Sequence, residues 1–143
     1  MAIDLNTRIN FVYGEPRELV PGIVRIVANN PTPLTFKGTN TYLVGTRSLA
    51  VIDPGPGKAD PNHCAAILRA AGGRQISHIV LTHTHHDHFD SLAELAAATK
   101  ALVAGFGRKP RPDQATRIGA DGREASTVTF EPDIVLRDGD LLE

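Results

Sequence analysis

The feature that most constrains this chain is a cluster of histidines directly after a short apolar segment. The segment Ile-Val-Leu at 79–81 is followed by the string Thr-His-Thr-His-His-Asp-His at 82–88, which holds four of the chain's six histidines. Side chains alternate along an extended strand, so His83 and His85 point to the same side and can bind one ion. The cluster therefore lies where a buried strand ends, the edge at which α/β sheets carry their functional sites.

The rest of the chain predicts strands and helices in alternation. Runs rich in β-branched and apolar residues predict strands over residues 22–28, 39–44, 49–53, 76–82 and 101–106. One helix is expected from Asp60 as its N-cap to the pair Gly72-Gly73, and a second over 89–99. The apolar stripes that would face the sheet are Cys64, Ile67, Leu68 and Ala71 in the first helix and Phe89, Leu92, Ala93 and Ala96 in the second. This alternation predicts an α/β (α+β layered) fold in one domain over residues 1–143.

Two segments near the end of the chain do not fit the alternation. From 107 to about 126 the pattern gives way to Gly, Pro and charged residues, and so long a loop is usually functional or mobile. We expect a mobile loop there. Further on, Asp138-Gly139 predicts a hairpin turn after an apolar run at 134–136, with a returning strand over 140–143. We therefore expect the sequence to stop within a structural unit.

Composition argues against several classes of partner. The formal net charge is −1, so no overall positive field favours nucleic acid or an anionic membrane. No run approaches the ~18 apolar residues of a membrane span, and the first residues carry charges where a signal peptide is apolar. Cys64 is the only cysteine, so no intrachain disulfide can form. We expect a cytoplasmic protein for which neither a membrane nor nucleic acid is the leading partner.

The residue types in the cluster suit a catalytic metal ion. Imidazole nitrogens with a carboxylate suit zinc best, and manganese or iron acceptably. Neutral imidazoles leave much of the cation's charge unquenched, so a bound water becomes acidic enough to supply hydroxide near neutral pH. Past the strand end, Asp87 and His88 can turn toward a second position, and Asp87 can ligate, orient the hydroxide and accept its proton. Because a structural zinc site commonly uses several cysteines, the sequence predicts a hydrolytic metal site of His83, His85, Asp87 and His88.

No direct chemical role is predicted for the other histidines. His63 is expected on the solvated start of the first helix, and His78 at the entry to a strand. His86 occupies the variable position of the cluster and is expected to point away from the metal.

The cluster resembles the His-x-His-x-Asp-His signature of the metallo-β-lactamase fold superfamily. Two further stretches match upstream, Gly-Thr-Asn-Thr-Tyr-Leu-Val-Gly at 38–45 and Val-Ile-Asp-Pro-Gly at 51–55. Together they resemble a β-lactamase-like hydrolase branch, close to hydroxyacylglutathione hydrolases and to lactamase-like proteins with nuclease activity. The resemblance runs from about Val20 onward and implies that the chain forms the N-terminal half of an αββα sandwich.

In this family the first two histidines of the signature hold one metal, and the Asp-His pair holds another. The resemblance thus implies His83 and His85 for the first ion, and Asp87 and His88 for the second. It also implies that Asp53 is not a ligand but hydrogen-bonds the metal loop and fixes its orientation. An alternative interpretation of Asp53 is a polar residue that simply ends a strand before a turn.

Other matches and departures qualify the resemblance. The side chains of residues 39–41, Thr-Asn-Thr, are expected to form hydrogen bonds with backbone polar groups nearby. The family often has small residues after the signature, whereas Phe89-Asp90-Ser91 follows here and would reshape the pocket floor. Relatives complete the site with a further histidine, a bridging aspartate and a last histidine, but no histidine follows His88. We therefore expect an incomplete site and an absent C-terminal half.

Three functions remain open on this basis. The leading hypothesis is a zinc-dependent hydrolase that cleaves an ester, thioester, lactam or related bond of a small molecule. The second is an RNA-processing metallo-nuclease, indicated only by a slight excess of basic residues over 108–123. The third is a metal-binding fragment without catalysis. Half of a sandwich would also expose apolar side chains and favour self-association or capture of a missing half, with these candidates: Val24, Leu43, Ile52 and Val80.

Overall fold

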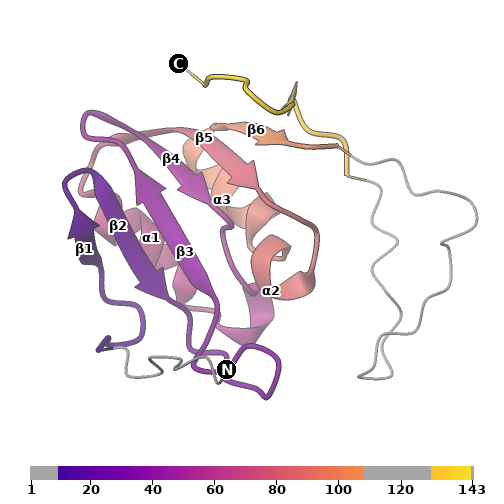
Figure 1. Cartoon of the computed structure of the whole chain (residues 1–143). Coiled ribbons are helices and arrows are strands. Elements are labelled where there is room, and N and C mark those ends of the chain that lie inside the picture. Colours follow the sequence, from indigo (N-terminus) through magenta and orange to yellow (C-terminus); the bar gives the residue numbers. More distant parts are fainter. Residues whose placement is uncertain (1–9, 108–129, 143) are drawn as a thin grey trace, which may run out of the picture.

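The computed structural model describes residues 10–107 and 130–142, which form one seven-stranded mixed sheet (Figure 1). Neighbouring strands follow the order of the chain. They are β1 (Arg17–Val20), β2 (Ile23–Val27), β3 (Asn40–Val44), β4 (Ser48–Ile52), β5 (Gln75–Leu81), β6 (Leu102–Gly105) and β7 (Ile134–Val135). Strands β1 to β4 pair antiparallel, whereas β4 to β7 pair parallel. This arrangement confirms the predicted α/β class.

Helices connect the parallel strands and cover one face of the sheet. Helix α1 (His63–Ala71) links β4 to β5, and α3 (Leu92–Thr99) links β5 to β6. Both lie behind the sheet in Figure 1. A parallel pair needs such a crossover because the chain must return to the same end of the sheet. A 3-10 turn, η1 (Gly57–Ala59), precedes α1, and the short helix α2 (His86–Phe89) precedes α3.

The hydrophobic core lies between the sheet and the two longer helices. Alternate residues of the central strands point toward α1 and α3, as expected for strands with one covered face. The buried cluster consists of Ile26, Leu43, Leu49, Val51, Cys64, Ala66, Ile67, Ala71, Ile76, Ile79 and Leu95. This packing fixes the ends of β4 and β5 relative to each other, which matters for the residues that follow them.

The opposite face of the sheet carries no helix in the described part of the chain (Figure 1). Ile52 and Val80 point to this face, because the residues before them in each strand belong to the core, and both are half-buried. Two expectations for this face are wrong. Leu43 is 1% exposed within the core, and Val24 packs against that core from the same side.

The first predicted helix begins later than expected. Asp60 is not its N-cap, because α1 begins at His63 directly after Asn62. The Asp60 carboxylate instead accepts the backbone N–H groups of Asn29 at 2.7 Å and of Asn62 at 3.3 Å, so it holds the turn that leads into the helix. Leu68, predicted to face the sheet, is 38% exposed and lies outside the core.

The second predicted helix is two helices. Helix α2 ends at Phe89 and α3 begins at Leu92. Between them, the backbone N–H of Ser91 donates to the carbonyl of Gly55 at 3.1 Å, and the Ser91 hydroxyl accepts the N–H of Gly57 at 2.9 Å. Contacts with the loop after β4 therefore accompany a break that apolar periodicity alone does not predict.

Ala93, predicted to face the sheet from the second helix, is exposed. Further differences lie at the two ends of the described chain. Strand β1 is not predicted, because all of its residues are exposed and give no alternation. The turn at 138–139 forms and is closed by the N–H of Asp140 on the carbonyl of Arg137 at 3.1 Å, but no returning strand follows up to residue 142. The loop expected over 107–126 lies almost entirely outside the described residues. Within those residues, no helix is long and apolar enough to cross a membrane.

Candidate metal centre

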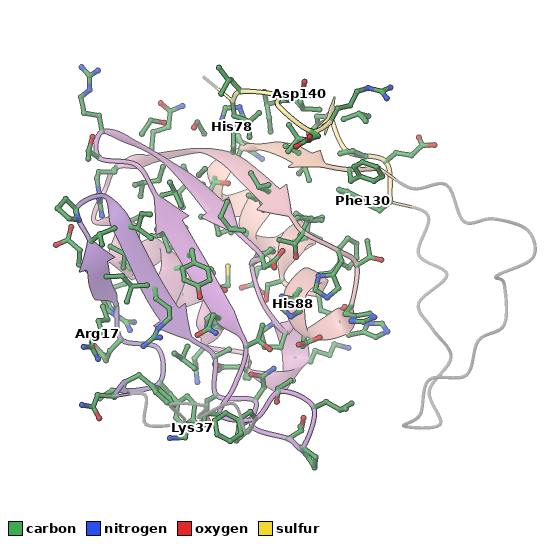
Figure 2. The ribbon with its side chains drawn as sticks, viewed as in Figure 1. Arg17, Lys37, His78, His88, Phe130 and Asp140 are labelled. Carbon is green, nitrogen blue, oxygen red and sulfur yellow. The ribbon has the colours of Figure 1, made fainter. Side chains whose placement is uncertain are left out.

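Three histidine rings gather where β5 ends and α2 begins, around the position of His88 in Figure 2. The ring centroids of His83 and His85 are 4.6 Å apart, and those of His83 and His88 are 4.4 Å apart. Asp53 reaches the same place from the end of the adjacent parallel strand β4. Parallel strands end at one edge of the sheet, which brings Asp53 and His88 together although 35 positions separate them.

Asp53 holds both ends of residues 82–88, which we call the metal loop. Its Oδ1 accepts the N–H of Thr82 at 2.8 Å. Its Oδ2 accepts the hydroxyl of Thr82 at 2.7 Å and the Nδ1–H of His88 at 2.9 Å. Burial alone would raise the pKa of this carboxyl, but the hydrogen bonds from His88 and Thr82 outweigh it and lower the pKa. The group is therefore a charged carboxylate at neutral pH, and both of its oxygens are engaged.

These hydrogen bonds determine which ring nitrogens keep a free electron pair. A carboxylate can only accept, so His88 donates to Asp53 through Nδ1, and the neutral ring keeps Nε2 unprotonated. The single hydroxyl proton of Thr82 also goes to Asp53. The hydroxyl must then accept the Nδ1–H of His83 at 2.8 Å, which leaves Nε2 of His83 free as well. Two Nε2 atoms are thus available to a metal ion.

Asp87 faces the free nitrogen of His88. Its Oδ2 lies 3.2 Å from Nε2 of His88 and accepts the hydroxyl of Thr39 at 2.9 Å. Two electron-pair donors this close repel each other unless a proton or a cation lies beside them. The hydrogen bond to Asp53 raises the pKa of His88, against the effect of burial, so a proton can fill this role. A metal ion that prefers nitrogen and carboxylate ligands fits the same pair.

One group of three residues has its ligand atoms within 4.8 Å of one another, namely Asp53, His83 and His88. It differs from the predicted ligand set because it includes Asp53 and leaves out His85 and Asp87. The exposed ring of His85 nevertheless lies beside His83, and Asp87 lies beside His88, so all four predicted ligands are neighbours. Asp53 could bind an ion only by weakening the hydrogen bonds that already use both of its oxygens.

Two other histidines lie away from this group. Nδ1 of His86 is 2.9 Å from Oδ1 of Asp90, in a pair that is exposed to solvent. His78 lies in the middle of β5 and not at its entry as expected, and its Nδ1 is 3.0 Å from the hydroxyl of Ser77. Figure 2 shows His78 at the opposite end of the sheet from His88.

Cys64 takes no part in the centre. It is buried in α1 and belongs to the hydrophobic core. Burial, together with the neighbouring carboxylate of Glu94, raises the pKa of the Cys64 thiol to about 11. The thiol is therefore neutral at physiological pH and poorly suited to bind a metal or act as a nucleophile.

Sequence reasoning named Asp53 as a support of the metal loop, but it did not find the roles of His63 and of the Thr39 side chain. The expected solvated position of His63 is wrong, because its side chain is fully buried and Nε2 lies 2.7 Å from the hydroxyl of Thr41. Thr39 is expected to bind backbone groups, but its hydroxyl donates to the side chain of Asp87. Two signals were available: the threonines are two positions apart on an extended segment, and His63 precedes the buried Ile67 by four positions in a helix.

Comparison with known proteins agrees with this geometry. Residues 34–140 match the metallo-beta-lactamase superfamily. A lactamase-like protein of Pestalotiopsis microspora is 35% identical over 111 residues, which cover 76% of this chain and 34% of that protein. An atrochrysone carboxyl ACP thioesterase of Passalora fulva is 42% identical over 79 residues, which cover 54% of this chain and 24% of that protein. The chain thus spans about a third or less of the length of these curated relatives.

Solved structures share the fold. BJP-1, a subclass B3 metallo-beta-lactamase of Bradyrhizobium japonicum, has a TM-score of 0.63 at 22% identity, over 90% of this chain and 47% of that one. A beta-lactamase domain protein from Burkholderia ambifaria has a TM-score of 0.58 at 20% identity, over 72% of this chain and 34% of that one. At these identities the likeness concerns the fold, of which the chain covers one part. The match over most of its residues shows that the chain belongs to the metallo-beta-lactamase superfamily.

Proposed function

We propose that this chain carries the metal-binding part of a zinc-dependent hydrolase. The observation that carries the proposal is the pair of Asp87 Oδ2 and His88 Nε2, which lie 3.2 Å apart and can both bind a cation when the ring of His88 is neutral. With Nε2 of His83 and the exposed ring of His85, they supply the nitrogen and carboxylate ligands that zinc prefers and that manganese or iron accept. We assign His83 and His85 to one ion, and Asp87 and His88 to a second.

Within this centre we give Asp53 a supporting role and Asp87 a catalytic one. Asp53 keeps both oxygens on the metal loop, so it orients the rings of His83 and His88 rather than binding an ion. Zinc would make water easier to deprotonate near neutral pH, so that it can attack an acyl carbon, and would supply positive charge to offset the negative charge on the carbonyl oxygen. The Asp87 carboxylate, held by Thr39 and 32% exposed, can orient the attacking water and accept its proton.

A thioester is the substrate class we propose first. Three relatives are named thioesterases, among them the Passalora fulva protein and the thioesterase pkgB of Emericella nidulans, which is 35% identical over 108 residues. The chemistry supports the same choice. A thiol has a pKa of about 8.5, so it leaves as a thiolate without prior protonation. Ester and lactam bonds have more basic leaving groups and need a proton donor, which makes them the second choice.

The described residues fill only part of the proposed site. Zinc usually takes four ligands in proteins, and two ions that share the four loop ligands would have two each. The proposal therefore requires further ligands from outside the described part of the chain. The open face of the sheet, where Ile52 and Val80 are half-buried, supports the packing of a second layer against it, from another copy or a further segment.

Zinc titration followed by a thioester assay tests the proposal. We expect the metal-free chain to bind added zinc. The zinc-loaded chain should then cleave a short acyl thioester of coenzyme A slowly, measured as released thiol. Asp87→Asn should weaken binding and abolish cleavage. Asp90→Asn is the matched control, because Asp90 contacts only the exposed ring of His86 among its side-chain partners. A chain that binds no zinc would contradict the proposal, whereas zinc binding without turnover on any substrate would favour a non-catalytic metal-binding role.

The alternative of an RNA-processing nuclease has no described contact in its favour. The basic residues that indicated it lie over 108–123, outside the residues that the structure describes. A phosphodiester included in the same assay discriminates between the two functions. Preferential cleavage of that substrate, together with RNA binding that weakens steeply with salt, would favour the nuclease.

A further inference from the structure

The buried imidazole of His63 is two hydrogen bonds away from the backbone of Asp53. Its side chain is completely buried, and Nε2 lies 2.7 Å from the hydroxyl of Thr41. That hydroxyl donates to the backbone carbonyl of Asp53 at 2.6 Å. A hydroxyl has one proton, so it must accept its second bond from the imidazole, which places the proton on Nε2 of His63. The three residues therefore form a directed chain of hydrogen bonds toward the metal centre.

Asp53, the last residue in this series of hydrogen bonds, has a backbone conformation that needs support. The φ of Asp53 is +52°, in the left-handed region that residues with side chains rarely adopt. Its N–H donates to the carbonyl of Val80 at 2.9 Å, and its own carbonyl accepts the hydroxyl of Thr41. The backbone held in this way sets the direction of the carboxylate that binds Thr82 and His88. Relaxation of the Asp53 carbonyl would turn the carboxylate away from the metal loop.

The imidazole also supports the loop after Asp53 by direct contact. A Cβ added to Gly55, whose φ is +103°, would lie 2.5 Å from Cδ2 of His63, so the ring packs against bare backbone. Gly55 in turn donates its N–H to the carbonyl of His88 at 3.2 Å and accepts the N–H of Ser91 at 3.1 Å. His63 is thus connected to the metal loop in two ways, through Thr41 to Asp53 and through Gly55 to His88.

The second ring nitrogen shows that packing alone does not explain a histidine here. Nδ1 of His63 has no hydrogen-bond partner among the described residues, and the Oδ2 atom of Asp60 is 3.9 Å away. A buried polar atom without a partner is unfavourable, and an apolar side chain of similar size would avoid that penalty. The bond made through Nε2 is therefore the feature that distinguishes histidine from leucine at this position.

We propose that His63 is a positioning residue of the metal centre, which acts through Thr41 to hold Asp53 in the orientation that binds the metal loop. The inference rests on the proposed function, because it gives His63 a role in a centre that binds metal. The hydrogen bonds themselves need no metal, so the positioning of Asp53 can be tested separately from metal binding.

Hydrogen exchange in the metal-free chain tests this positioning. The Thr82 amide reports on the Asp53 carboxylate, and the Gly45 amide, which donates to Gly22 at 2.9 Å beyond the far end of β3, is the control. We expect His63→Leu to raise the Thr82 exchange rate about tenfold or more, with a change below about threefold at Gly45. His63→Gln keeps an N–H donor and should stay close to the native rates. Equal acceleration at both amides, or none at Thr82, would overturn the proposal.

A second pair of variants tests the link through Thr41 while leaving the buried ring in place. Thr41→Val removes the hydroxyl and should reproduce the effect of His63→Leu, whereas Thr41→Ser should remain near native. Combining His63→Leu with Thr41→Val should add little, because the two groups act in series. Full additivity would show that they act independently and would overturn the proposal. The ¹⁵N chemical shifts of the native His63 ring should show the proton on Nε2, and a proton on Nδ1 alone would overturn the direction of the chain.

Zinc titration separates this inference from the proposed function. If the native chain binds zinc, we expect the affinity to fall about 10–100-fold in His63→Leu and to be largely retained in His63→Gln. Unchanged affinity in both variants would overturn the positioning role. If the native chain binds no zinc, the proposed function fails, and the exchange rate at Thr82 still decides whether His63 positions Asp53.

Discussion

His83 and His85 of the metal loop are exposed, whereas Thr41, Asp53 and His63, which we call the buried support, are 0%, 6% and 0% exposed. Both regions contain histidine, but hydrogen bonds orient the protonated ring nitrogen differently in the two regions. In the loop, His83 directs its proton inward and presents a free electron pair outward. In the support, the proton of His63 is directed toward the loop and the free electron pair is buried. The proposed ligands at the surface thus owe their orientation to buried groups that lie behind them.

Removing the exposed ligands should have the largest effect on metal binding. We expect His83→Ala combined with His85→Ala to abolish most zinc uptake, because the first position would lose both of its ligands and the remaining pair, Asp87 and His88, should bind an ion more weakly. The fold should change little, since both side chains are exposed. Elemental analysis of the purified proteins measures the bound metal. His86→Ala, which removes the ring paired with Asp90, is the matched control, and equal metal content in both proteins would refute the ligand assignment.

Disturbing the buried support should have the largest effect on stability. In Gly55→Ala the new Cβ would meet Cδ2 of His63 at 2.5 Å, and the φ of +103° disfavours any side chain. We expect the free energy of unfolding to fall by about 3 kcal/mol or more. Gly73→Ala is the control, with φ +80° and nothing within 4 Å of the added atom, and should lose only about 1–2 kcal/mol. Urea denaturation of both variants provides the comparison, which similar losses would contradict.

A change at Asp53 should affect both properties moderately, since this residue joins the two regions. In Asp53→Asn one carboxylate oxygen becomes an NH2 group, which donates and cannot accept. At the Oδ1 position it would break the bond from the Thr82 N–H, and at the Oδ2 position the bonds from the Thr82 hydroxyl and the Nδ1–H of His88. We expect a loss of about 1–3 kcal/mol in the free energy of unfolding. Zinc affinity should fall about 10–100-fold. Calorimetric titration with zinc and thermal unfolding measure the two effects, and an unchanged zinc affinity would show that the loop orients itself.

The smallest expected effect is a dependence of stability on pH. Burial lowers the pKa of His63, against the charge of Asp60, so the unfolded chain binds more protons than the folded one below about pH 6.5. This group therefore lowers the free energy of unfolding as the pH falls through 6.5, by at most about 1.4 kcal/mol per pH unit. His88 acts in the opposite sense, because its pKa is raised and its contribution is lost as the pH rises. Denaturation at pH 5.5 and 7.5 should show a smaller loss at low pH in His63→Gln than in the native chain, and equal losses would contradict the buried, neutral ring.

Local sequence predicts β2 to β6 well because each has a run of β-branched or apolar residues. Ile23–Val27 and Ser48–Ile52 differ from the expected bounds by one residue at either end. The metal loop is also predictable, because its ligands lie within one short string after such a strand. Both features depend on neighbours in the sequence, for which spacing and residue type are sufficient evidence.

The errors arise where a distant residue competes with a local preference. Asp60 has the side chain of an N-cap, but the N–H of Asn29, 31 positions away, engages its carboxylate. Ser91 lies in a good helical pattern, but its bonds to Gly55 and Gly57 accompany the break between α2 and α3. His63 appears polar in isolation, and only the packing of α1 against the sheet makes it a buried donor. No pattern within a single element contains this information.

The agreement between strand order and chain order has a consequence for how the molecule assembles. Each strand from β2 onward pairs with the strand that precedes it, so the sheet can grow by adding one strand at a time in the order of the chain. All of the hydrogen bonds that orient the metal loop and its support join residues between 30 and 91. During synthesis, these contacts can therefore form once β5 and the start of α3 have left the ribosome, before β6 and β7 are available for pairing.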